Sequence, residues 1–269
     1  MAKLASQTIT GPAGKLNVVS TDTATDELPV LFLHGINMSH DVWVPLIEAL
    51  PEDRRYIAVD LRGHGRSDRR GPFDAADYAA DALAVLDALE VPRTHVVGTS
   101  FGGSAACVVA ARAPERVASV TAIGSALKVE GIDVDGAIAA LQAVGLQAFF
   151  ESFMPQASFA PGTDESLINR AVAVAVTDRT PETVIAVSRA AFSADVTATA
   201  QAVSCPALVV VGQYDATCPV ALATAMSEAL RAKLVVLPGR GHVATYEDPA
   251  LVVDTLLPHL ASAKAQPVG

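Results

Sequence analysis

The sequence has few cysteines, a deficit of basic residues and no long hydrophobic run. Its three cysteines, Cys107, Cys205 and Cys218, include no Cys-x-x-Cys pair, so no disulfide framework is expected. Free thiols are typical of a reducing compartment, which predicts a cytoplasmic location. The net charge of −10 disfavours binding to nucleic-acid phosphates or to anionic membrane surfaces. Neither a run of about 20 apolar residues nor an apolar stretch within residues 1–15 is present, so no membrane span or signal peptide is expected.

The composition is that of a folded domain with a sizeable core. Hydrophobic residues make up 51% of the chain and charged residues 18%, which excludes intrinsic disorder. A length of 269 residues predicts one α/β domain with an insertion, or two small domains. No His-Glu-x-x-His or similar ligand spacing occurs, so no metal and no cofactor are expected.

Apolar runs and helical patterns alternate along most of the chain. An antiparallel hairpin is expected from segments 7–10 and 16–20, on either side of a Gly-Pro-Ala-Gly turn. The runs that follow are continuously apolar, as in strands buried on both faces, so they predict a mostly parallel sheet covered by helices on both sides. The predicted strands are 30–33, 56–59, 95–97, 117–123, 207–211 and 234–237, and the predicted helices are 41–50, 75–89, 101–113, 220–230 and 249–260.

Residues 125–202 break this alternation. They contain three helical patterns with no strand between them: one over about 136–153, one beginning near Asp164, and one beginning at Thr180 with Pro181 at its first position. We therefore predict an all-helical insertion between two strands of the sheet. Residues 1–124 and 203–269 would form the α/β core around it.

A Gly-Thr-Ser-Phe-Gly segment at residues 98–102 joins the predicted strand 95–97 to an alanine-rich helix. A serine in such a sharp turn, with glycine two residues away on each side, has the form of a nucleophile elbow. The turn holds the Ser100 hydroxyl clear of the backbone, and side chains at Gly98 and Gly102 would collide across it. An ordinary strand-to-helix turn is the alternative interpretation of this segment alone.

Three further segments follow predicted strands and supply the other groups that such a serine needs. They are His34-Gly35, Gly212-Gln213-Tyr214-Asp215 and Gly239-Arg240-Gly241-His242. The chain order serine, aspartate, histidine is that of the α/β-hydrolase triad. Over essentially its whole length the sequence resembles small α/β-hydrolase-fold proteins, a group that includes bacterial carboxylesterases, lactonases and non-haem perhydrolases.

This resemblance implies a role for five residues. Ser100 would be the nucleophile, His242 the general base, and Asp215 the carboxylate that orients His242. The backbone N–H groups of Ile36 and Phe101 would form the oxyanion hole. The resemblance also implies that insertion 125–202 is a cap over the active site, with a decorative helical layer as the alternative.

The remaining histidines are assigned structural roles. His34 precedes the oxyanion loop, and His64 lies in a segment, residues 60–67, that resembles the family's Asp-x-Arg-Gly-x-Gly-x-Ser turn. His40, His95 and His259 have no partner motif and are expected to be surface or internally satisfied residues.

The substrate pocket is expected to be apolar. Its predicted lining comprises Trp43, Phe150, Phe153, Met154 and Val243, although packing of the cap onto the core is the alternative for the residues of the insertion. An apolar pocket predicts a small hydrophobic ester or lactone as the partner, and the oligomeric state stays open.

The predicted function is hydrolysis of a carboxylic ester or lactone through an acyl-enzyme on Ser100. Two alternatives remain: hydrolysis of a C–C bond by the same triad, and a hydrolase-fold ligand sensor with little turnover. A serine nucleophile disfavours the haloalkane dehalogenases and epoxide hydrolases of this fold. Val243 stands where C–C hydrolases of the family tend to have tryptophan, which lowers that alternative.

Overall fold

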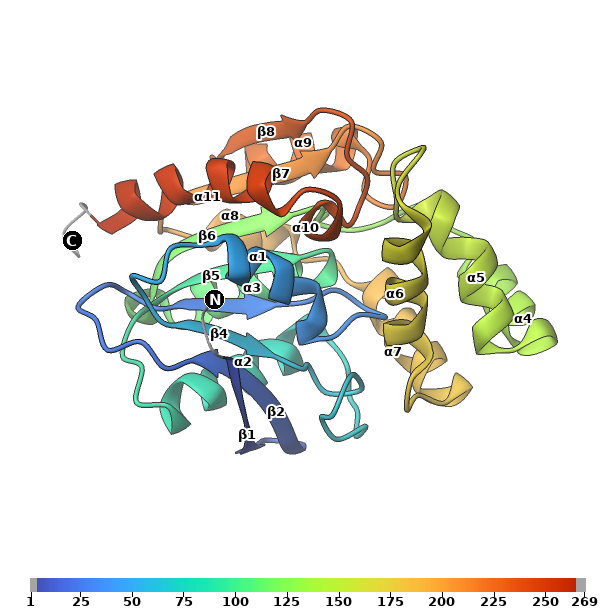
Figure 1. Cartoon of the computed structure of the whole chain (residues 1–269), viewed down its shortest axis with the longest axis horizontal. Helices are drawn as coiled ribbons and strands as arrows, with labels where there is room; N and C mark the ends of the chain where they lie inside the picture. The colour runs from blue at the N-terminus through green and yellow to red at the C-terminus, as the bar shows by residue number, and fades with distance from the viewer. Residues whose placement is uncertain (1–3, 265–269) are drawn as a thin grey trace.

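The computed structural model describes residues 4–264 and contains an eight-stranded, mostly parallel sheet (Figure 1). The strand order is β1-β2-β4-β3-β5-β6-β7-β8, and only the β1–β2 and β2–β4 pairs are antiparallel. The strands are β1 (Leu4–Gly11), β2 (Gly14–Thr21), β3 (Val30–Leu33), β4 (Tyr56–Val59), β5 (Thr94–Thr99), β6 (Val117–Ile123), β7 (Ala207–Gly212) and β8 (Lys233–Leu237). This architecture confirms the predicted α/β fold. Residues 1–3 and 265–269 lie outside the described part of the chain.

Continuous apolar runs become central strands because both faces of the sheet are covered. Every residue of β3, β4 and β6 is buried, and their bounds coincide with the predicted ones. One face carries α2 (Ala75–Ala88), α3 (Phe101–Arg112), α8 (Thr197–Ala202) and α9 (Val220–Leu230). The other face carries α1 (Val44–Ala49), α10 (Ala244–Glu247) and α11 (Pro249–Lys264). Two hydrophobic clusters, one on each face, form the core.

One predicted helix is interrupted. The segment predicted as a helix over 41–50 is a 3-10 turn (His40–Trp43) followed by the short helix α1. Pro45 occupies the first turn of α1, and because proline has no N–H it cannot continue a helical ladder from the preceding turn.

The chain between β6 and β7 contains five helices and no strand. It forms α4 (Val134–Val144), α5 (Leu146–Ala157), α6 (Glu165–Val176), α7 (Pro181–Ser193) and α8. The pattern predicted as one helix over 136–153 is two helices, because Gly145 adopts a φ of +82° between α4 and α5. Figure 1 shows α4 to α7 together at the end toward which the parallel strands point, whereas α8 packs against α3 and α9. No helix within residues 4–264 is both long and apolar enough to span a membrane.

Candidate active site

Ser100 occupies a strained turn between β5 and α3. Its backbone has φ +53° and ψ −128°, a conformation that non-glycine residues rarely adopt. A Cβ on Gly98 would lie 2.2 Å from the carbonyl oxygen of Gly102, and a Cβ on Gly102 would lie 2.1 Å from that of Leu33. Both positions therefore require glycine, and the close passage of these backbones leaves the serine side chain at the top of the turn.

His242 and Asp215 form a buried pair on the loops after β8 and β7. The His242 Nδ1 lies 2.8 Å from the Asp215 Oδ2 and 3.0 Å from its Oδ1, and each residue is only 4% exposed. The Asp215 Oδ1 also accepts a hydrogen bond of 2.7 Å from the backbone N–H of Cys218. With Nδ1–H donating to this carboxylate, the Nε2 of His242 is left as a proton acceptor.

A glycine at the end of β6 allows this pair to approach the sheet. Gly124 has φ +54°, and a Cβ there would lie 2.9 Å from the Asp215 Oδ2 and 3.1 Å from the His242 Nδ1. A side chain at this position would therefore displace the pair. The carboxylate and the imidazole consequently lie over the carboxyl ends of β6, β7 and β8, where parallel sheets place their functional side chains.

The loop after β3 lies directly against the serine. A Cβ on Gly35 would be 2.6 Å from the Cβ of Ser100, so only glycine fits there. Next to it, His34 is fully buried, with its Nδ1 2.7 Å from the Gly35 carbonyl oxygen and its Nε2 accepting from the Leu61 N–H at 2.9 Å. Burial lowers the pKa of His34 to about 4, so the ring is neutral and holds the loop, as the sequence predicts.

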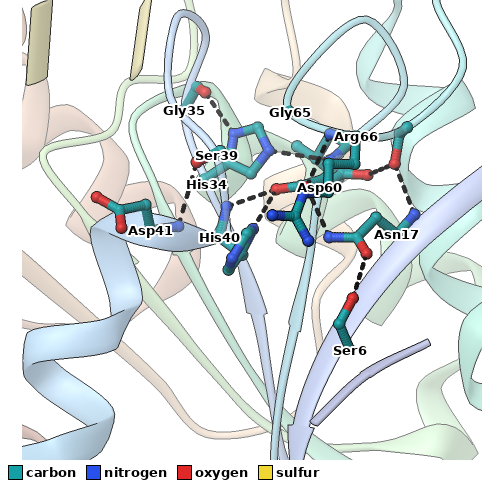
Figure 2. Close-up of polar contacts among 12 residues, drawn as sticks. Ser6, Asn17, His34, Gly35, Ser39, His40, Asp41, Asp60, Gly65 and Arg66 are labelled. Carbon is teal, nitrogen blue, oxygen red and sulfur yellow. Dashed lines mark hydrogen bonds and ion pairs between the residues drawn. The ribbon is translucent and has the colours of Figure 1, made fainter. Parts of the chain in front are cut away.

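Asp60, at the end of β4, anchors the same loop from below (Figure 2). Its buried carboxylate accepts from the backbone N–H and the Nδ1 of His40 at 2.7 and 2.8 Å, from the Nδ2 of Asn17 at 2.8 Å and from the Arg66 N–H at 3.1 Å. Burial alone would raise the pKa of Asp60, but its hydrogen bonds to His40 and its electrostatic interaction with that ring outweigh burial and hold the pKa below the ordinary value. Sequence reasoning missed this role, although the segment that begins at Asp60 was its signal.

A cavity of about 220 Å³ lies above the sheet and is bounded by Ser100, His242 and the oxyanion-loop residues. Ile36 and Phe101, the expected oxyanion residues, both line it. The remaining wall is mostly apolar and comes largely from α4, α5 and α7. It includes Ile138, Leu141, Phe149, Phe150, Phe153, Met154, Val184, Ile185 and Phe192.

Two of the five predicted pocket residues lie elsewhere. Phe150, Phe153 and Met154 border the cavity, but Trp43 and Val243 belong to the hydrophobic core. Trp43 is 0% exposed, with its ring 4.9 Å from that of Phe32, because the 3-10 turn directs it toward the sheet.

Two further residues, outside the predicted pocket lining, also border this cavity. Cys218 borders the cavity beside Asp215, and all three cysteines are free thiols. Asn37, which follows Ile36, contributes a polar group to the cavity wall. Within residues 4–264, no cluster of histidine, cysteine, aspartate or glutamate is arranged to hold a metal ion.

The fold and this constellation define a class of protein. The alpha/beta hydrolase fold family model matches residues 29–249, and the chain belongs to that family. Over 252 residues it is 31% identical to the dihydrolipoyllysine-residue acetyltransferase component of the acetoin cleaving system of Pseudomonas putida, covering 86% of this chain but only 63% of that relative. It is 24% identical to 3-oxoadipate enol-lactonase 1 of Acinetobacter baylyi, over 93% of this chain and 94% of the relative.

A solved structure shows the same likeness in three dimensions. A thermophilic esterase from Thermogutta terrifontis matches 96% of this chain and 99% of its own with a TM-score of 0.84 at 25% sequence identity.

Proposed function

We propose that this chain is a serine hydrolase that cleaves a carboxylic ester or lactone through an acyl-enzyme on Ser100. The observation that carries the proposal is that the elbow serine and His242, whose Nδ1 lies 2.8 Å from the buried Asp215 carboxylate, border one apolar cavity. A serine hydroxyl is a weak nucleophile at neutral pH and needs such a base beside it. The enol-lactonase relative and the esterase structure support the same reaction class.

In this mechanism, the Ser100 Oγ attacks the substrate carbonyl carbon while the His242 Nε2 takes its proton. Asp215 stabilises the imidazolium that forms. The negative charge that develops on the carbonyl oxygen is bound by the N–H groups of Ile36 and Phe101. Collapse of the tetrahedral intermediate breaks the C–O bond, and His242 returns the proton to the leaving oxygen. Water, deprotonated by His242, then attacks the acyl-enzyme and releases the acid.

The cavity supports a small and mainly apolar substrate. Its volume of about 220 Å³ lies below the roughly 300–1,000 Å³ of pockets that hold drug-sized ligands. The walls that α4, α5 and α7 provide are largely aliphatic and aromatic. Burying an ionised acyl chain against such a surface would be costly, so we propose a neutral acyl group. The helices α4 to α7 would then act as the cap. In this proposal the insertion is residues 125–202, and residues 1–124 and 203–269 form the α/β core.

The test is turnover of a chain-length series of p-nitrophenyl esters and a panel of lactones, with Ser100→Ala measured alongside. We expect hydrolysis that Ser100→Ala abolishes, with a preference for short or medium acyl chains. Undiminished turnover in Ser100→Ala would overturn the nucleophile assignment. Labelling of Ser100 by a fluorophosphonate without turnover of any ester or lactone would instead favour C–C bond hydrolysis or a ligand sensor.

A further inference from the structure

Arg179 is a buried cation that makes no ion pair within residues 4–264. It lies in the turn between α6 and α7, is 7% exposed, and donates from Nη1 to the Asn37 Oδ1 at 2.7 Å and to the Ala175 carbonyl oxygen at 3.4 Å. Its Nε and Nη2 are buried without a hydrogen-bond partner among the same residues. Burial lowers the pKa of Arg179 to about 10, so the side chain stays charged at neutral pH. A buried charge without a counter-ion destabilises a fold, so its retention here calls for a functional explanation.

The side chain that accepts the hydrogen bond from Arg179 belongs to the oxyanion loop, the loop after β3 that contains Ile36. Asn37 directly follows Ile36 and adopts φ +60°, a left-handed conformation that costs most residues free energy. Two hydrogen bonds hold it there. Its side-chain Oδ1 accepts from Arg179, and its backbone N–H donates to the Nε2 of His64 at 3.2 Å.

The second of these bonds also depends on Arg179. The Nδ1 of His64 lies 3.1 Å from the Arg62 carbonyl oxygen, to which it can only donate, so the Nε2 must be the unprotonated nitrogen. Burial and then the charge of Arg179 hold the pKa of His64 well below its ordinary value. A protonated His64 would present an N–H toward the Asn37 N–H and break the bond. The arginine therefore acts on the side chain of Asn37 directly and favours the neutral ring that holds its backbone.

We propose that Arg179 is a positioning residue, reaching from the helical insertion to fix Asn37 and thereby the adjacent Ile36 N–H. The proposal rests on the proposed function for the role of that N–H as an oxyanion donor. The geometry of the oxyanion hole would then depend on both the α/β core and the helical insertion.

The test is a double-mutant cycle between Arg179→Met and Asn37→Gly. Glycine adopts φ +60° without strain and removes the side chain that the arginine holds. We expect Arg179→Met alone to lower kcat for a short p-nitrophenyl ester by about 10- to 100-fold, with little change in KM, because a displaced N–H donor loses most of its stabilisation of the transition state. The rate of Ser100 labelling by a fluorophosphonate should fall by a similar factor. In the Asn37→Gly background the same change should cost less than about 3-fold.

Two further variants separate positioning from general stability. Arg179→Lys keeps the buried charge and one donor, so it should retain more activity than Arg179→Met. Arg170→Met is the matched control, since Arg170 also links the insertion to the core, through Asp41 at 2.7 Å on both nitrogens, without touching the oxyanion loop. It should lower the Tm while leaving kcat within about 3-fold of wild type.

The outcomes decide the proposal whether or not the proposed function holds. An equal loss from Arg179→Met in both backgrounds, or an effect on KM alone, would overturn it. If wild-type protein neither turns over esters nor is labelled, the proposed function fails, and hydrogen exchange of segment 34–40 then decides. Faster exchange there in Arg179→Met, but not in Arg170→Met, would support the positioning role, and unchanged exchange would overturn it.

Discussion

Asp215→Asn replaces a carboxylate oxygen by an amino group without changing the shape of the side chain. In the structure the Asp215 Oδ1 accepts from the Cys218 N–H at 2.7 Å, and its Oδ2 faces the His242 Nδ1 at 2.8 Å. The backbone donor at Cys218 would keep the amide oxygen on its own side. The new NH₂ group would then face His242, which could bond to it only through an unprotonated Nδ1.

The expected loss of activity follows from the tautomer. A His242 that carries its proton on Nε2 cannot accept the Ser100 proton, so kcat should fall by about 10³- to 10⁴-fold, which is roughly 4–5.5 kcal/mol of transition-state free energy. The Tm should change little, because both hydrogen bonds have a substitute and the volume is conserved. The assay is kcat for the preferred p-nitrophenyl ester, together with thermal unfolding.

The matched control for this change is Asp248→Asn. Asp248 lies in the same region but pairs with Arg240 at 3.3 Å and accepts from the Leu251 N–H at 3.1 Å. Its variant should retain kcat within a few-fold. Two results would refute the reasoning: Asp215→Asn retaining wild-type kcat, or Asp248→Asn losing more activity than Asp215→Asn. Retained activity with a loss of about 1–3 kcal/mol in stability would show that the amide had flipped and left the Cys218 N–H facing a donor.

Three other changes test the fold and the cavity. Burial lowers the pKa of His95 to about 3, so only the unfolded state binds a proton at this group as the pH falls. Lowering the pH from 6.5 to about 5 should therefore reduce the free energy of unfolding by about 1.6 kcal/mol through His95; urea unfolding of wild type and His95→Asn checks this, and an identical pH slope in both would contradict it. Gly98→Ala would place its Cβ 2.2 Å from the Gly102 carbonyl oxygen, so we expect a loss of at least about 3 kcal/mol, and a Tm within a few degrees of wild type would be inconsistent with the elbow. Phe150→Ala, at a 1% exposed position, should lower the free energy of unfolding by about 3–5 kcal/mol, whereas Phe153→Ala, at 43% exposure, should lower it by less than about 1 kcal/mol. Both variants should extend the preference to longer acyl chains, and an unchanged chain-length profile would mean that neither ring limits the substrate.

Local patterns in the sequence predicted most of the elements. The central strands are recognisable because strands buried on both faces must be continuously apolar, and β3, β4 and β6 begin and end where those runs do. The glycines at 98 and 102 predicted the turn at Ser100 because only glycine avoids a backbone collision there. Errors arose where a short local feature overrode the pattern, as at Pro45 before α1 and at Gly145 between α4 and α5.

The sequence by itself determined the α/β class and the order serine, aspartate, histidine along the chain, because both are properties of segments and their succession. Only the tertiary structure decided which side chains meet. Trp43 faces the core and Phe150 the cavity because of the direction in which a turn or helix presents each side chain. The bond between Asn37 and Arg179 joins residues 142 positions apart, on a β-strand loop and a helical insertion. Such a contact depends on how separate elements pack in space, which no local pattern of residues encodes.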